Sequence, residues 1–116
     1  MANCKAILRQ WCSELISVVL PHSSQPESAN LEEIGESSAV VLMDRAVRAG
    51  TRIALKCRTK MLYGIVASYT IDEHLGFFVE ILLDAGNLWS PQWFAPEHLL
   101  PPLQEKPPKA ITSGAA

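Results

Sequence analysis

The chain of 116 residues has little of what marks the more specialised classes of protein. Its three cysteines, Cys4, Cys12 and Cys57, are an odd number without a Cys-x-x-Cys pair, which fits neither a disulfide framework nor a zinc ribbon. A net charge of −2 provides no long-range attraction to nucleic acid or anionic membranes. No apolar run approaches the roughly 20 residues that a membrane-spanning helix needs. We therefore expect reduced thiols and a cytoplasmic protein that does not insert into membranes.

The residue patterns that support catalysis or cofactor binding are also missing. The sequence has no Gly-x-Ser-x-Gly motif, and it offers no combination of nucleophile, base and orienting group. His22, His74 and His98 are far apart, and none has the spacing of a known metal motif. Asp72 and Glu73 beside His74 fit a solvated turn better than a metal site. We predict a protein that is not an enzyme and has no catalytic residues, cofactor or metal.

The N-terminal region has apolar residues at helical spacing. Steps of four and three join Cys4, Leu8, Trp11, Leu15, Val18 and Val19. This spacing predicts an amphipathic helix within residues 1–20, which Asn3 begins and which ends before Pro21. Such a helix packs on the rest of its own chain or pairs with the same helix of a second copy to form a homodimer. The sequence leaves both arrangements open.

After a proline- and serine-rich linker at residues 21–29, the pattern changes to that of strands. Runs rich in β-branched and apolar residues occupy Ser38–Met43, Thr51–Arg58, Met61–Thr70 and Gly76–Leu83. We expect a mainly β fold, with an antiparallel barrel over residues 30–100 and a short helical turn at Pro96–Leu100 that closes it. Residues 101–116 are expected to form a flexible tail.

Three stretches within residues 30–100 resemble a PilZ domain. They read ANLEEIGESSAVVLMDRAVRAGTRIAL, YGIVASYTIDEHLGFFVEI and LWSPQWFAPEHLLPP. The resemblance implies a six-stranded, split β-barrel. It also implies a cyclic di-GMP site built from an Arg-x-x-x-Arg motif before the barrel and an Asp/Asn-x-Ser-x-x-Gly motif that enters a strand. In such a site the arginines bind the phosphates and stack on the guanines.

This chain departs from both family motifs. Glu33, Gly35 and Ser38 stand at the three specified positions of the second motif, and all three differ from it. The linker at residues 21–29, where the first motif is expected, contains no arginine, and Glu80 is expected to narrow the same surface. Nearby carboxylates would repel an anionic dinucleotide. We therefore predict that cyclic di-GMP is not bound at the usual place, with a receptor that uses a non-standard site as an alternative.

A basic segment follows the expected strand at Ser38–Met43. Six cations lie within sixteen residues without an acid among them, namely Arg45, Arg48, Arg52, Lys56, Arg58 and Lys60. Arg48 and Arg52 have the Arg-x-x-x-Arg spacing but not its place before the barrel. The segment is either a solvated strand face or a patch for an acidic partner or nucleic-acid phosphates.

The sequence therefore favours a PilZ-like adaptor of bacterial signalling that acts by binding an unidentified protein. Trp11 and Trp93 are the candidate apolar contacts, because large aromatic side chains dominate protein interfaces. The alternative is a small nucleic-acid-binding barrel that uses residues 45–60.

Overall fold

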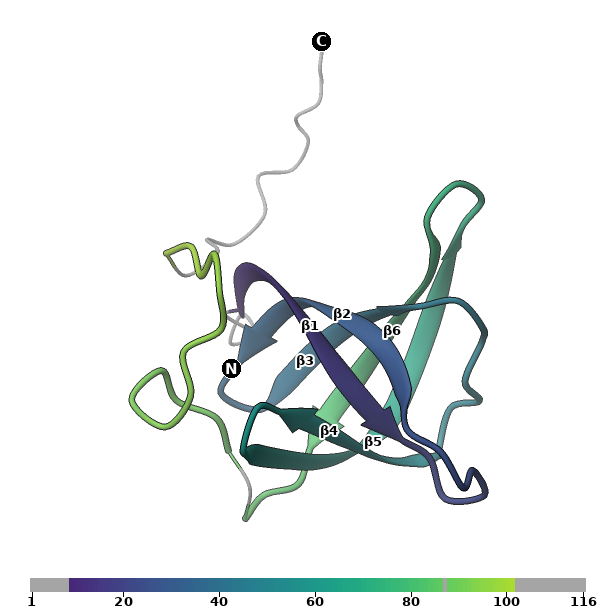
Figure 1. Cartoon of the computed structure of the whole chain (residues 1–116), viewed down its shortest axis with the longest axis horizontal. Helices are drawn as coiled ribbons and strands as arrows, with labels where there is room; N and C mark the ends of the chain where they lie inside the picture. The colour runs from purple at the N-terminus through teal and green to yellow at the C-terminus, as the bar shows by residue number, and fades with distance from the viewer. Residues whose placement is uncertain (1–8, 87, 102–116) are drawn as a thin grey trace, which may run out of the picture.

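A computed structural model describes residues 9–86 and 88–101, which contain six strands (Figure 1). These are β1 (Arg9–Val19), β2 (Glu27–Gly35), β3 (Ser38–Met43), β4 (Arg52–Cys57), β5 (Lys60–Asp72) and β6 (Gly76–Leu83). They form a closed antiparallel barrel in the order β1-β2-β3-β6-β5-β4. The expected mainly β, six-stranded antiparallel barrel is thus confirmed. In the described part of the chain, no helix has the length and apolar character needed to cross a bilayer.

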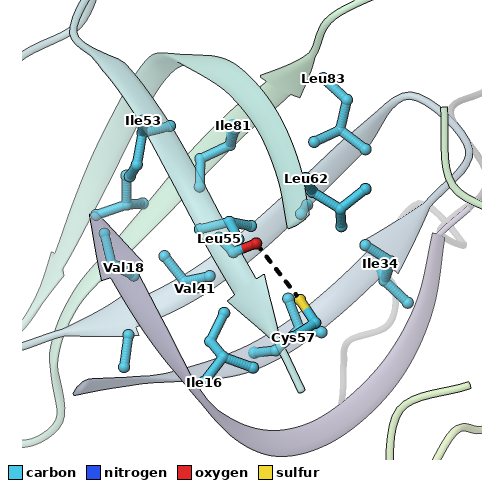
Figure 2. Packing of buried hydrophobic residues seen from close by; sticks show 14 of the residues in the cluster. Ile16, Val18, Ile34, Val41, Ile53, Leu55, Cys57, Leu62, Ile81 and Leu83 are labelled. Atoms are coloured by element: carbon cyan, nitrogen blue, oxygen red, sulfur yellow. Dashed lines mark hydrogen bonds between the residues drawn. The ribbon is translucent and has the colours of Figure 1, made fainter. Parts of the chain in front are cut away.

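Alternation along the strands fills the barrel with apolar side chains. In β4, Ile53, Leu55 and Cys57 point inward while the residues between them face outward, as the sequence predicts. Figure 2 shows these side chains converging with those of Val18, Val41, Leu62 and Ile81 from four other strands. Gly64 lets β5 approach β6, because a Cβ at that position would lie 2.3 Å from the carbonyl oxygen of Leu82.

The expected N-terminal helix is wrong over the described residues, because Arg9–Val19 form strand β1. Residues 1–8 lie outside the described part. The helical spacing misled because the apolar residues lie on both faces of a strand. Cys12, Ile16, Val18 and Leu20 are buried, whereas Trp11, Leu15 and Val19 face outward. Glu14 also faces inward, and a carboxylate at a core position is unusual. It therefore interrupts the alternation of apolar and polar residues that normally marks a strand.

The expected domain boundaries change with this strand. The barrel begins at Arg9 rather than at residue 30, and β2 takes in the end of the expected linker at 21–29. Residues 20–26 therefore connect two neighbouring strands, β1 and β2, instead of joining a helix to a barrel. Of the expected tail at 101–116, only Pro101 is described.

The junction of β1 with β4, called the seam below, is short, because it pairs only Ser17–Val19 with Ala54–Lys56. The C-terminal segment covers the rest of it. The backbone N–H of Ser13 donates to the carbonyl of Glu97 (3.2 Å), and that of Leu100 donates to the carbonyl of Trp11 (2.8 Å). Residues 97–100 thus run antiparallel to the first half of β1.

The expected turn at Pro96–Leu100 is present at residues 97–98, but it is not helical. A single helical turn lies earlier, where the N–H groups of Trp93 and Phe94 donate to the carbonyl of Ser90. This turn carries the buried Trp89 and Phe94 against the core, and the Trp89 indole N–H donates to the Phe94 carbonyl (2.8 Å). Both aromatic side chains therefore close the barrel.

Candidate functional site

Arg9, at the start of β1, is the centre of a cluster on the outer wall of the barrel. Its Nε lies 3.1 Å from Glu33 Oε1, and its Nη1 lies 3.0 Å from Glu80 Oε2. The same Nη1 donates to the hydroxyl of Ser38 at 3.4 Å, and Ser68 donates to Glu80 at 3.4 Å. One guanidinium thus bridges two carboxylates from β2 and β6. These residues are called the Arg9 cluster below.

Strand register explains why these residues meet. Glu33 pairs with Val40, Val40 with Glu80, and Glu80 with Ser68, so they form a row across β2, β3, β6 and β5. Cross-strand neighbours on one face lie within reach of each other. Since Arg9 contacts both ends of the Glu33–Val40–Glu80 row, its guanidinium spans Val40, which is 8% exposed although it faces outward.

The cluster contains the family-motif positions that the sequence singled out. Glu33 and Ser38 both contact Arg9, and Gly35 is buried at the end of β2. Glu80 joins the same surface, as expected. The structure therefore brings Glu33, Ser38 and Glu80 together and adds an arginine that the sequence reasoning did not include.

The linker at residues 21–29, where the first motif was expected, does not precede the barrel, because strand β1 (Arg9–Val19) comes before it in the chain. Residues 1–8 lie outside the described part of the chain.

A second arginine, Arg58, is exposed and binds the buried Glu14 at the seam. Its Nε and Nη2 donate to the two oxygens of Glu14 at 3.0 and 2.7 Å, and Glu14 also accepts the backbone N–H of Glu97 (2.9 Å). The guanidinium lies 5.1 Å from the centroid of the Phe94 ring. Arg58 has a φ of 62° in the turn between β4 and β5, which is strained for a residue with a Cβ. Called the Arg58 cluster below, this group binds β1, the turn and the C-terminal segment together.

The predicted basic patch is divided by carboxylates. Arg45 pairs with Glu27, Arg52 with Asp84 and Arg58 with Glu14, while Lys60 lies 5.4 Å from the centroid of the Trp93 ring. Hydrogen bonding to Arg52 lowers the pKa of Asp84, and hydrogen bonding to Glu27 raises the pKa of Arg45. Within residues 9–86 and 88–101, Arg48 and Lys56 have no carboxylate partner. The sequence could not reveal this division, because the pairing acids lie on distant strands.

Three outward-facing residues of β1 are apolar. Trp11, Leu15 and Val19 are 53%, 71% and 38% exposed, and together they are called the β1 stripe below. Beside Leu15 lies a hollow of about 290 Å³ whose lining is largely polar, with Glu14, Ser17, Ser28, Lys56 and Arg58. Across the seam, Val19 pairs with Ala54, and Ala54 pairs with Tyr63, which is 46% exposed. Exposed apolar side chains thus lie on β1 and β5 on either side of β4, next to a lysine that has no carboxylate partner among the described residues.

The two candidate apolar contacts have different environments. Trp11 is exposed in the β1 stripe, whereas Trp93 is partly buried, packs against the core and lies beside Lys60. Only Trp11 therefore offers an open apolar surface.

The two cysteines in the described part of the chain, Cys12 and Cys57, are free and buried. Burial raises the pKa of both Cys12 and Cys57 from 9.0 to about 12, and the nearby carboxylate of Glu14 adds to the effect. Both thiols are thus protonated core groups rather than nucleophiles. Among the described residues, no three His, Cys, Asp or Glu side chains gather as metal ligands would.

Comparison with known proteins found no matching family model and no matching curated protein.

Proposed function

We propose that this chain is a non-catalytic, PilZ-like adaptor that binds another protein and does not bind cyclic di-GMP. Two features support the PilZ assignment. The fold is a six-stranded antiparallel barrel. Arg9, at the start of β1, contacts Glu33 and Ser38, which stand at two positions of the second motif.

The charges of the Arg9 cluster argue against the family ligand. A phosphate would have to displace Glu33 and Glu80 from the guanidinium, and both carboxylates would then face the phosphate. Carboxylates next to a phosphate repel it, and loss of the two ion pairs with Arg9 makes the free energy of phosphate binding still less favourable. The carboxylates thus occupy the positions that a phosphate would need, which favours a surface without nucleotide.

The observation that carries the proposed protein-binding role is the β1 stripe. Leu15, at 71% exposure, lies beside the hollow that Lys56 lines. Large apolar side chains gathered on an exposed face are typical of docking surfaces. We therefore expect a partner that inserts an apolar side chain next to Leu15 and places a carboxylate at Lys56.

Nucleic-acid binding receives less support, because carboxylates already pair with three of the six cations of the basic segment. Lys60 lies beside Trp93, but this ring is partly buried and offers little surface for base stacking. Binding that falls steeply with added salt would support this alternative.

The experiment is capture of partners from native lysate, followed by binding of the purified partner to single variants. Leu15→Asp should weaken binding by at least about thirtyfold, since loss of a central interface side chain commonly costs about 2 kcal/mol or more. Leu88→Asp is the matched control, because Leu88 is 46% exposed on the loop after β6 and lies outside the stripe. Equal affinity of the Leu15→Asp variant and the unaltered protein would contradict the proposed docking face.

A further inference from the structure

The outer half of β5 is an open sheet edge. β4 pairs with β5 only as far as Ile65, and Val66 then exchanges hydrogen bonds with Gly50 and Thr51. Beyond this point, Ser68–Asp72 pair with β6 alone. Among the described residues, no backbone hydrogen bond reaches the other side of this segment. Figure 1 shows the β5–β6 hairpin projecting from the barrel at this edge.

This edge has only part of the usual protection against strand pairing. Natural edge strands are kept apart by charges, prolines or bulges. β5 has a bulge between Val66 and Ser68, but Ala67–Ile71 contain no charge and no proline. The apolar side chains of Tyr69 and Ile71 are 42% and 63% exposed, and that of Leu75 at the hairpin tip is 60% exposed. The edge thus offers both free backbone groups and apolar area to an added strand.

We propose that a second copy of this chain binds here, edge to edge, to form a twofold-symmetric dimer with a continuous β6-β5-β5-β6 sheet. In the register that centres Thr70 on the twofold axis, Tyr69 faces Ile71 of the second copy. An aromatic residue opposite a β-branched one is a favourable cross-strand pair. Twofold symmetry repeats this contact on the other side of the axis.

Charge complementarity selects a second copy as the occupant. In this antiparallel register, Glu73 in the hairpin tip of one copy lies opposite Ala67 of the other. Ala67 follows Val66, whose carbonyl accepts the N–H of Gly50 from the neighbouring turn. Arg48 lies in this turn, and its backbone carbonyl accepts the N–H of Thr51. Arg48 and Glu73 are both exposed, and neither has a charged partner among the described residues. The dimer would form two Arg48–Glu73 pairs.

Sedimentation of the full chain over a wide concentration range tests this proposal. We expect a reversible monomer–dimer equilibrium. Thr70→Lys should abolish the dimer, because it places two lysines opposite each other on the axis. Thr59→Lys is the matched control, since Thr59 is exposed in the turn between β4 and β5 and should leave the dimer intact. Thermal unfolding confirms that both variants fold.

A charge swap tests the register and the identity of the occupant. Arg48→Glu and Glu73→Lys should each weaken dimerisation by roughly tenfold, because each replaces two attractions by two repulsions. The double variant should regain the dimer, as should an equimolar mixture of the two single variants. Lys56→Glu and Glu36→Lys are controls of matching charge at exposed sites away from the edge.

Three results would overturn the proposal. The first is a purely monomeric protein at every concentration, which would leave the edge to an extended segment of another protein. The second is a dimer that survives Thr70→Lys. The third is a double charge-swap variant that dimerises no better than either single variant.

Discussion

The Arg58 and Arg9 clusters use the same chemistry in two different environments. Arg58 binds Glu14, whose side chain is 9% exposed, whereas the Glu33 and Glu80 side chains that bind Arg9 are 27% and 32% exposed. The guanidinium groups have the reverse order, because the Arg58 side chain is 51% exposed and that of Arg9 is 21% exposed. A buried carboxylate without its partner is costly, but a partly solvated one keeps water as an alternative. We therefore expect the buried Glu14 to make the Arg58 cluster the more important of the two for stability.

The largest expected effect is that of removing the guanidinium at the seam. Arg58→Ala should lower the free energy of unfolding by roughly 3 kcal/mol, because Glu14 would stay buried without a cation. Denaturant unfolding measures this change. Arg58→Gly should be less damaging by about 1 kcal/mol, since glycine adopts the positive φ without strain. A loss below about 1 kcal/mol for Arg58→Ala would remove the distinction between the two clusters.

The next effect tests how the C-terminal segment contributes to the seam. Trp89→Phe keeps a large ring in the core but removes the indole N–H that donates to the Phe94 carbonyl. We expect a loss of about 1–2 kcal/mol in the free energy of unfolding, because a buried carbonyl is left without its donor. Unfolding measurements on Leu88→Ala, at an exposed neighbour, provide the control.

Removal of the outer-wall arginine should have little effect on stability. Arg9→Ala should lower the free energy of unfolding by under about 1 kcal/mol, since its partners are partly solvated. The same denaturant experiment decides the point. A loss as large as that of Arg58→Ala would show that the Arg9 cluster is also a structural element.

The buried cysteines report on opening of the seam. In a Cys4→Ser background, Cys12 and Cys57 should react slowly with a thiol reagent at neutral pH, because burial raises their pKa values to about 12. Arg58→Ala should speed the reaction at least tenfold, while Arg9→Ala should leave the rate unchanged. Equal acceleration by both variants would contradict a role at the seam that Arg58 has and Arg9 lacks.

These thiols also give stability a pH dependence. Their folded-state pKa values of about 12 lie above the ordinary value of 9.0. The unfolded chain therefore ionises first, so their contribution is complete below pH 9.0 and is lost as the pH rises towards 12. Unfolding at increasing pH should show this decline, and Cys12→Ala combined with Cys57→Ala should reduce it.

Some elements could be predicted from the sequence because local signals agreed. β3 and β6 have the predicted bounds, Ser38–Met43 and Gly76–Leu83, since turn-forming residues flank short apolar runs. β1 could not be predicted, because its outward face carries Trp11, Leu15 and Val19, and Glu14 occupies an inward position. The inward position of Glu14 depends on its contact with Arg58, which is distant in the sequence. Local periodicity cannot reveal such a contact.

The candidate site was predicted in part for the same reason. Glu33, Ser38 and Glu80 were all singled out through the resemblance to PilZ domains. Arg9 was missed because its role depends on β1 lying beside β2, a pairing that local periodicity did not predict. The division of the basic patch was missed because Glu27, Asp84 and Glu14 meet their arginines only across the closed barrel.

The most direct test of the central claim is calorimetric titration of the full chain with cyclic di-GMP. The account predicts no saturable heat, because Glu33 and Glu80 already occupy the guanidinium of Arg9. Saturable binding with micromolar affinity that disappears in Arg9→Ala would contradict it, and would show that a nucleotide displaces the two carboxylates.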